Sequence, residues 1–298
     1  MSEHLPDTAI LKNHSNLRAL CDLVIDRTTQ AETAALRWEP APAAFAPLDD
    51  RLASCRDGTI IHVRSGDLAP FFAEIFPRIA VRVVLVTAGD AAAPGVHRRW
   101  LDDPRILRWF GQNCDLAAPH SKFELLPLVL PDQHHPYGDQ AALLRVHRRM
   151  PSVAEKPLLA LANFHLRMTH PTRRAALEQV QGLPGVELQP KRVPTELLWV
   201  RHANYAFEIS PRGNGLDCHR TWEALLLRTI PIVLTSTLDP VYAEFPVVIV
   251  GDWREITPHA MARWRDEHRD GFTRAMFERL TIAWWHDRIR DACAAERR

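Results

Sequence analysis

Residues 205–235 are the stretch that most limits what this chain can fold into, because a strand, a turn, a helix and a second strand follow one another there. Residues 205–210 are short and mostly apolar, and residues 230–234 form a similar apolar run. Between them, residues 211–217 contain a proline, two glycines and charged side chains, which indicates a turn. Residues 219–227 carry apolar side chains at helical spacing. The segment therefore predicts one strand–helix–strand unit of a parallel sheet.

Strands and helices also alternate along the rest of the chain, in two blocks separated by a change of pattern at residues 150–157. Further strand candidates lie at 59–63, 81–87, 106–110, 123–128, 158–162, 186–188 and 247–250. Continuous apolar strands that alternate with helices are typical of a parallel sheet covered on both faces. We therefore predict an α/β fold with two Rossmann-like domains, residues 1–153 and 154–298, and helices from residue 261 to the end. Residues 17–25 are predicted to form a further helix.

Size and charge limit the class of partner. A chain of 298 residues with 46% hydrophobic residues can build one large or two medium cores. The formal net charge is +1, from 37 basic and 36 acidic side chains, so no global basic field points to nucleic acid. Five scattered cysteines without metal-ligand spacing, and a polar N-terminus, favour a reducing cytoplasm. Peripheral association with the inner face of the membrane stays open.

The 211–219 region has the chemistry of a phosphate site. Backbone N–H groups at a helix start attract anions, and Arg212, His219 and Arg220 place positive or hydrogen-bonding groups beside them. Glu223, one turn into the helix, is a candidate for binding ribose or sugar hydroxyls. Alternatively, one arginine pairs with Asp217 or Glu223 and only holds the turn. Gly213 and Gly215 either adopt positive φ angles or let a ligand approach the backbone closely.

This region closely resembles the nucleotide-sugar-binding segment of exostosin-like glycosyltransferases, which have the GT-B architecture. The residues that match are Ser210, Pro211, Arg212, Gly213, Asn214, Gly215, Asp217, Cys218, His219, Arg220, Thr221, Trp222, Glu223 and Ala224, followed by Ile230, Pro231, Ile232 and Val233. The resemblance covers roughly residues 60–257, with weak matches between Val129 and Asp139. One departure is Arg228-Thr229, where the family usually has a glycine. The resemblance implies two Rossmann-like domains facing across a cleft, a donor site formed by residues 212–215, Asp217, His219, Arg220 and Glu223, and a last helix that returns to the first domain.

Sugar transfer also needs a base that removes the proton of the acceptor hydroxyl. Carboxylates in turns that follow strands of the first block are the candidates, because ligands bind at the carboxyl ends of parallel strands. We rank Asp90 first and Asp67 second, with Asp115 and the His134-His135 pair as alternatives. Other polar candidates for the donor or acceptor site are Asn113, Lys122 and Asn163, whereas Arg173 is expected to face solvent on its helix.

The predicted activity follows from these residues and the resemblance. The chain has no Asp-X-Asp motif, so we predict no metal and no cofactor, with arginines and a helix start stabilising the leaving diphosphate. The expected enzyme moves a sugar from a nucleotide-diphosphate donor to a glycan or glycolipid hydroxyl, with inversion as the family implies. The alternatives are another phosphate-handling transferase and a degenerate GT-B protein that binds nucleotide or glycan without turnover.

Overall fold

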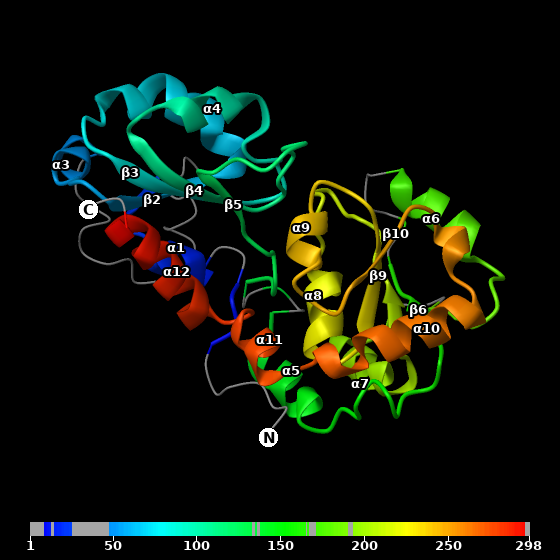
Figure 1. The fold of residues 1–298 in the computed structure, drawn as a ribbon. Helices are drawn as coiled ribbons and strands as arrows, with labels where there is room; N and C mark the ends of the chain where they lie inside the picture. The colour runs from blue at the N-terminus through cyan, green and yellow to red at the C-terminus, as the bar shows by residue number, and fades with distance from the viewer. Residues whose placement is uncertain are drawn as a thin grey trace. The chain divides into compact units, whose positions relative to one another are not determined.

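The computed structural model describes residues 9–12, 15–25, 48–132, 135, 138–164, 166, 171–189 and 193–295. The chain forms two compact units, each with its own parallel sheet of five strands (Figure 1). We call His14–Leu126 with Trp285–Arg298 the N-terminal unit, and Met1–Asn13 with Pro127–Trp284 the C-terminal unit. The predicted α/β fold with two Rossmann-like sheets is confirmed.

The sheet of the N-terminal unit takes its strands in chain order, β1-β2-β3-β4-β5, and every pairing is parallel. The strands are β1 (Leu23–Ile25), β2 (Thr59–Arg64), β3 (Val83–Ala88), β4 (Ile106–Gly111) and β5 (Phe123–Leu125). All six residues of β3 are buried, as expected for a central strand covered on both faces. The helix predicted over residues 17–25 is wrong in its second half, because residues 23–25 pair with β2 as an edge strand.

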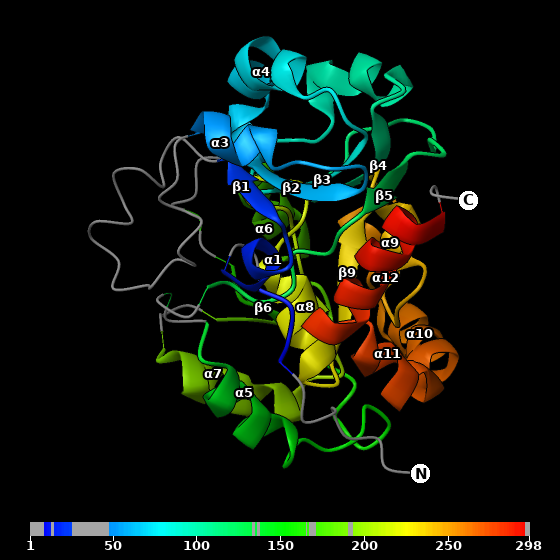
Figure 2. The same ribbon diagram turned by 90° about the vertical axis from the view of Figure 1, so that its left-hand side faces the viewer.

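Helices cover both faces of this sheet (Figures 1 and 2). The short helices α1 (Ser15–Ala19), α3 (Leu48–Ala53) and α4 (Leu68–Pro70) come from the N-terminal unit's own connections, and α12 (Ile282–Ala295) comes from the end of the chain. Right-handed crossovers between strands taken in order place their connections on one face, where α4 lies. The opposite face is covered by α1 and α12, and Arg290 of α12 contacts Asp22 at 3.2 Å. The last helix therefore belongs to the N-terminal unit.

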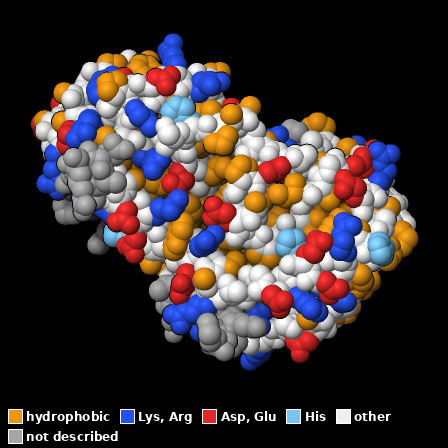
Figure 3. Space-filling view, in the orientation of Figure 1, with side chains coloured by type: hydrophobic (Ala, Val, Ile, Leu, Met, Phe, Trp, Pro, Cys, Tyr) orange, Lys and Arg blue, Asp and Glu red, His pale blue; other side chains and the backbone are white. Residues whose placement is uncertain are grey.

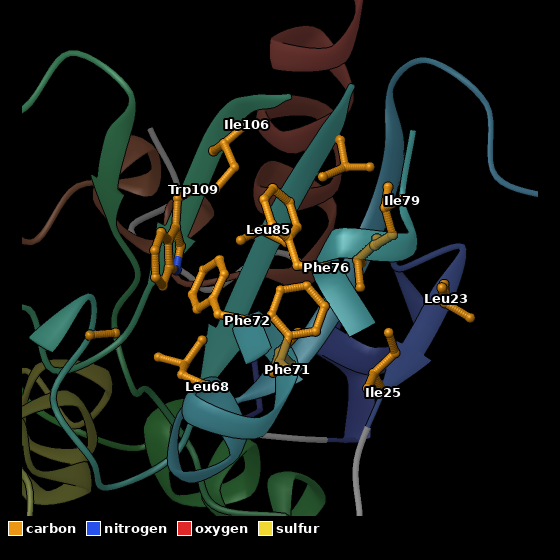
Figure 4. Packing of buried hydrophobic residues seen from close by; sticks show 14 of the residues in the cluster. Leu23, Ile25, Leu68, Phe71, Phe72, Phe76, Ile79, Leu85, Ile106 and Trp109 are labelled. Atoms are coloured by element: carbon orange, nitrogen blue, oxygen red, sulfur yellow. The ribbon is translucent and has the colours of Figure 1, made fainter. Parts of the chain in front are cut away.

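Aromatic rings fill the core beneath α4 and the π-helical turn Phe71–Ile75 that continues it. Phe72 lies at the centre, with ring centroids 5.1 Å from Phe71, 5.4 Å from Phe76 and 5.6 Å from Trp109. Figure 4 shows these rings packed over Leu85 of β3 and beside Ile106 of β4. Large rings that contact strands from one face supply much of the buried apolar area of this unit.

The sheet of the C-terminal unit has the order β10-β9-β8-β6-β7, again with parallel pairings. Its strands are β6 (Ala160–Ala162), β7 (Val186–Leu188), β8 (Phe207–Ile209), β9 (Ile230–Leu234) and β10 (Val248–Val250). From β6 the chain first adds β7 on one side and then β8, β9 and β10 on the other. The strand order therefore reverses between β6 and β8, and this is the topological switch point of the sheet.

The helices of this unit are α5 (Gln140–His147), α6 (Thr172–Val180), α7 (Thr195–Arg201), α8 (His219–Leu226), α9 (Asp239–Tyr242), α10 (Pro258–His268) and α11 (Arg274–Glu278). Three of them begin with side-chain caps, since Asp139, Thr257 and Thr273 each accept a hydrogen bond from a backbone N–H of the first turn. None of the described helices is long and apolar enough to cross a membrane.

The units divide earlier in the chain than the predicted boundary after residue 153. Helix α5 packs on α7 and so lies with the second sheet, and the change of unit falls at Pro127. The first described residues also belong there, because the Leu11 amide donates to the Leu280 carbonyl at 2.9 Å. Both differences arise from contacts between distant segments, which a local change of pattern cannot reveal.

Candidate functional site

The residues predicted to bind the donor follow β8 at the switch point of the C-terminal sheet. Strand β8 ends at Ile209 and α8 begins at His219, with the 211–218 turn between them. Asn163 follows the neighbouring strand β6. Where the strand order reverses, the connections leave the carboxyl ends of adjacent strands toward opposite faces of the sheet, which leaves space for a ligand. The topology thus supports a ligand site at the position that the sequence indicates.

Arg212 and Arg220 occupy different environments in this turn. Arg220 Nε donates to the Asn163 carbonyl at 2.7 Å and lies 3.2 Å from Glu208 Oε1, so Arg220 joins the ends of β6 and β8. Its acidic partner is therefore Glu208, and not Asp217 or Glu223. Arg212 is half-buried and donates from Nη2 to the Asn214 carbonyl at 3.2 Å. Among the described residues Arg212 has no acidic partner, which leaves its charge available to a phosphate.

Gly213, the first glycine of the turn, allows a close approach to its backbone. Neither Gly213 nor Gly215 has a positive φ, so the first of the two explanations for them is wrong. A Cβ atom on Gly213 would lie only 3.1 Å from Arg173 Nη2. Asn214 is exposed beside Gly213, and its carbonyl binds Arg212. The chain here needs a residue without a side chain because a guanidinium lies against the backbone.

Asp217 is buried and its carboxylate is engaged by the protein's own donors. It accepts hydrogen bonds from the Leu128 amide at 2.9 Å, from Trp222 Nε1 at 2.8 Å and from the Tyr242 hydroxyl at 2.9 Å. Burial raises the pKa of Asp217 to about 6, although these hydrogen bonds favour the charged form. Its contacts tie the turn to α8 and α9, which gives Asp217 a structural use within the site.

Glu223 lies on α8, buried beside Arg220. Burial, with a contribution from the nearby charge of Glu208, raises the pKa of Glu223 to about 7, and Arg220 opposes this shift. Glu208 is fully buried in β8 and its other oxygen accepts a hydrogen bond from His202 Nε2. Sequence reasoning missed both Glu208 and His202. The available signal was a charged residue in the middle of the apolar strand at 205–210.

His219, the first residue of α8, contacts a neighbouring loop of the same unit. Its Nδ1 atom donates to the Val129 carbonyl at 3.0 Å. Val129 has a φ of 41°, which is unusual for a β-branched residue and turns its carbonyl toward the helix start. This contact fixes the His219 ring next to the turn, so the start of α8 is held by residues from two loops.

The candidate bases lie in the N-terminal unit. Asp67 closes a short 3₁₀ turn after β2 and is half-buried, with its Oδ2 atom shielded from solvent and without a hydrogen-bond partner. Asp90 follows β3 and is exposed. Asp115 is also exposed and accepts a hydrogen bond from the Gly95 amide at 2.9 Å. These three carboxylates follow β2, β3 and β4, which are neighbours in the sheet.

The other polar candidates have structural contacts. Asn113 is buried and donates from Nδ2 to the Gly89 carbonyl at 2.7 Å. Lys122 donates from Nζ to the Asp103 carbonyl at 3.1 Å. Of the histidine pair, His134 lies outside the described residues, and His135 belongs to the C-terminal unit. The expectation that Arg173 faces solvent is wrong, because its side chain is buried beneath the 211–218 turn.

No protein-family model matches this chain, and no curated protein matches it in sequence. Several solved structures are similar at low identity. An alpha,alpha-trehalose 6-phosphate synthase from Burkholderia multivorans has a TM-score of 0.44 and 11% identity, over 83% of this chain and 74% of the other. The glycosyltransferase AviGT4, involved in avilamycin A biosynthesis, has a TM-score of 0.36 and 13% identity, over 73% and 85% of the two chains. The fold assignment above rests on the two sheets themselves.

Proposed function

We propose that this chain is a glycosyltransferase that takes a nucleotide-diphosphate sugar as donor and a glycan or glycolipid hydroxyl as acceptor. The observation that supports this most is the position of the 211–218 turn. It lies at the topological switch point, ends at a helix start, and carries Arg212, a guanidinium without an acidic partner among the described residues. The resemblance of residues 210–233 to exostosin-like transferases supports the same assignment.

In the proposed reaction, residues of this chain stabilise the leaving diphosphate and remove the proton of the acceptor hydroxyl. The acceptor oxygen forms a bond to the anomeric carbon while the bond from that carbon to the diphosphate oxygen breaks, with inversion. Arg212 and the N–H groups at the start of α8 stabilise the negative charge on the leaving diphosphate. Arg220 is held by Glu208 and Asn163 and adds positive potential at the same place. This arrangement uses no metal ion.

The roles of the carboxylates are also proposals. Glu223, buried beside Arg220, is proposed to bind a ribose or sugar hydroxyl. Asp90 or Asp67 of the N-terminal unit is proposed to accept the proton from the acceptor hydroxyl. Asp67 is more shielded from solvent than Asp90, because its Oδ2 atom is buried and has no hydrogen-bond partner, whereas Asp90 is exposed.

A thermal-shift screen of the native chain against nucleoside diphosphates and their sugars tests donor binding. A ligand that binds the folded state raises the melting temperature. Arg212→Ala should remove that rise, whereas Arg263→Ala, which changes an exposed arginine of α10, should keep it. If no diphosphate or nucleotide sugar stabilises the native chain, the proposal is wrong.

Turnover separates the enzyme from a protein that only binds. Asp67→Asn and Asp90→Asn should leave donor binding unchanged, and one of them should lower sugar transfer or donor hydrolysis about 100-fold or more. A native chain that binds donor without hydrolysing or transferring it would favour the degenerate GT-B alternative. Native turnover in both variants would show that neither residue is the base.

A further inference from the structure

Arg173 of α6 has a buried guanidinium that reaches both ends of the 211–218 turn. Only 5% of the residue is exposed. Its Nε donates to the Arg212 carbonyl at 3.0 Å, and its Nη2 lies 3.7 Å from Cys218 Sγ at the start of α8. Between these contacts the guanidinium lies against Gly213, where a Cβ atom would come within 3.1 Å of Nη2. One planar side chain therefore spans the turn from its first arginine to the helix cap.

Burying this cation is costly, so its contacts must offset the cost locally. Desolvation lowers the pKa of Arg173, and the nearby positive charge of Arg220 lowers it further. A planar guanidinium with several N–H donors can hold two separate acceptors at fixed angles, which an ammonium group cannot do. Because the Arg212 carbonyl and side chain share one Cα atom, the hydrogen bond to the carbonyl restrains the backbone from which the Arg212 side chain projects.

We propose that Arg173 is a positioning residue of the diphosphate site, which holds the 211–218 turn so that Arg212 faces the ligand. This inference rests on the proposed function. It also gives a reason for glycine at position 213, because a Cβ atom there would press on the guanidinium at 3.1 Å. Arg173 acts through Arg212 and the turn, and does not itself need to contact phosphate.

The test compares binding of UDP, GDP and ADP with binding of the corresponding nucleosides. Arg173→Met keeps an unbranched apolar side chain that fills the place of the arginine stem, and it removes the guanidinium fork. It should weaken binding of the preferred diphosphate about 10- to 100-fold and leave nucleoside binding unchanged. Arg173→Lys should lose most of the same affinity, because the charge alone does not restore the two-ended contact. Arg174→Met, at the exposed neighbouring position, is the matched control and should change neither affinity.

A double-mutant cycle distinguishes positioning from direct contact. In an Arg212→Ala background, Arg173→Met should cost little further affinity, because the group that it positions is already absent. Full additivity of the two changes would overturn the proposal, and so would recovery of affinity by Arg173→Lys. Equal loss of nucleoside and diphosphate binding would also overturn it, since that is the effect of a merely structural residue.

Gly213→Ala provides a second variant if Arg173→Met does not fold. The added methyl group would lie 3.1 Å from Arg173 Nη2, so it should push the guanidinium out of place by a few tenths of an ångström while its charge is kept. The same selective loss of diphosphate affinity is expected. Gly251→Ala, where the new methyl would meet Glu255 only at 3.4 Å, is the control. If the native chain binds no diphosphate, the proposed function itself fails. If it binds and Arg212→Ala abolishes binding, but Arg173 and Gly213 variants behave like their controls, only the positioning role fails.

Discussion

Glu208 and Glu223 place two carboxylates near one guanidinium in the interior of the C-terminal unit. Arg220 lies 3.2 Å from Glu208 Oε1, and its charge also acts on Glu223. His202 satisfies the second oxygen of Glu208, and its own Nδ1 lies 3.0 Å from the Leu198 carbonyl. Arg220 and His202 thus both contact Glu208 directly, whereas Glu223 has Arg220 only as a nearby charge. That imbalance gives Glu223 a titration that affects stability.

Glu223→Gln should change how stability depends on pH. The pKa of Glu223 rises from 4.5 in the unfolded chain to about 7 in the folded one, so the folded state holds its proton longer. Below pH 4.5 both states are protonated, and between 4.5 and 7 the unfolded state gains stability by ionising first. The native chain should therefore lose up to about 3 kcal/mol through this group as the pH rises to 7.

The measurement is urea unfolding at pH 5 and pH 8. Relative to the native chain, Glu223→Gln should gain stability at pH 8, and Glu178→Gln, at an exposed site on α6, should follow the native pH dependence. A native-like pH profile in Glu223→Gln would mean that another buried acid, such as Asp217 with a pKa of about 6, carries the effect.

At the scale of elements, the turn that ends β3 depends on its backbone conformation. Gly89 has a φ of 128°, and a Cβ atom there would lie 2.8 Å from Ser65 Oγ. Its amide donates to Gln112 Oε1 at 3.2 Å and its carbonyl accepts from Asn113 Nδ2 at 2.7 Å. The turn that follows β3 is therefore held by the residues that follow β4, and this contact positions the turn of Asp90.

Gly89→Ala should destabilise the N-terminal unit by roughly 2–4 kcal/mol, because it combines a strained φ with a steric overlap. Gly66→Ala adds a methyl group with no atom within 4 Å and without a positive φ, so its effect should stay within about 1 kcal/mol. Denaturant unfolding measures the stability of both variants, and hydrogen exchange of peptides from β3 and β4 shows whether the loss lies in the N-terminal unit. Equal stability of the two variants would contradict the steric argument.

At the scale of the whole molecule, the end of the chain completes the unit near its beginning. Trp285, Ile289 and Cys293 of α12 are buried, and Arg288 pairs with Glu124 of β5. The connections between these strands, which are taken in chain order, lie on one face of the sheet. The last helix therefore packs on the opposite face, which those connections leave uncovered. The surface shown in Figure 3 mixes acidic and basic side chains, in keeping with a net charge of +1.

Ile289→Ala should therefore destabilise the N-terminal unit, by about 2–4 kcal/mol for a fully buried side chain. Hydrogen exchange should show faster opening of β2 to β4 and little change in β8, β9 and α8. Asp291→Ala, at an exposed position of the same helix, serves as control. Increased exchange confined to the second sheet would contradict the assignment of α12 to the first.

The sequence by itself determined the identity of most elements and the place of the candidate site. The apolar run at 81–87 became β3, residues 230–234 became β9, and the polar turn at 211–217 separates β8 from α8 as predicted. These features depend on local composition and periodicity, which act over a few residues. The approximate position of the turn that we propose binds phosphate therefore needed no three-dimensional information.

Only the tertiary structure decided which segments become neighbours. The strand order places β6 beside β8 and so brings the Asn163 carbonyl to Arg220. The buried side chain of Arg173 packs against Gly213. Glu208, in place of Asp217 or Glu223, became the acidic partner of Arg220. The assignment of α5 and α12 to units also depends on contacts between residues far apart in the chain. Local periodicity reports which face of an element is apolar, and it carries no information about the partner that covers that face.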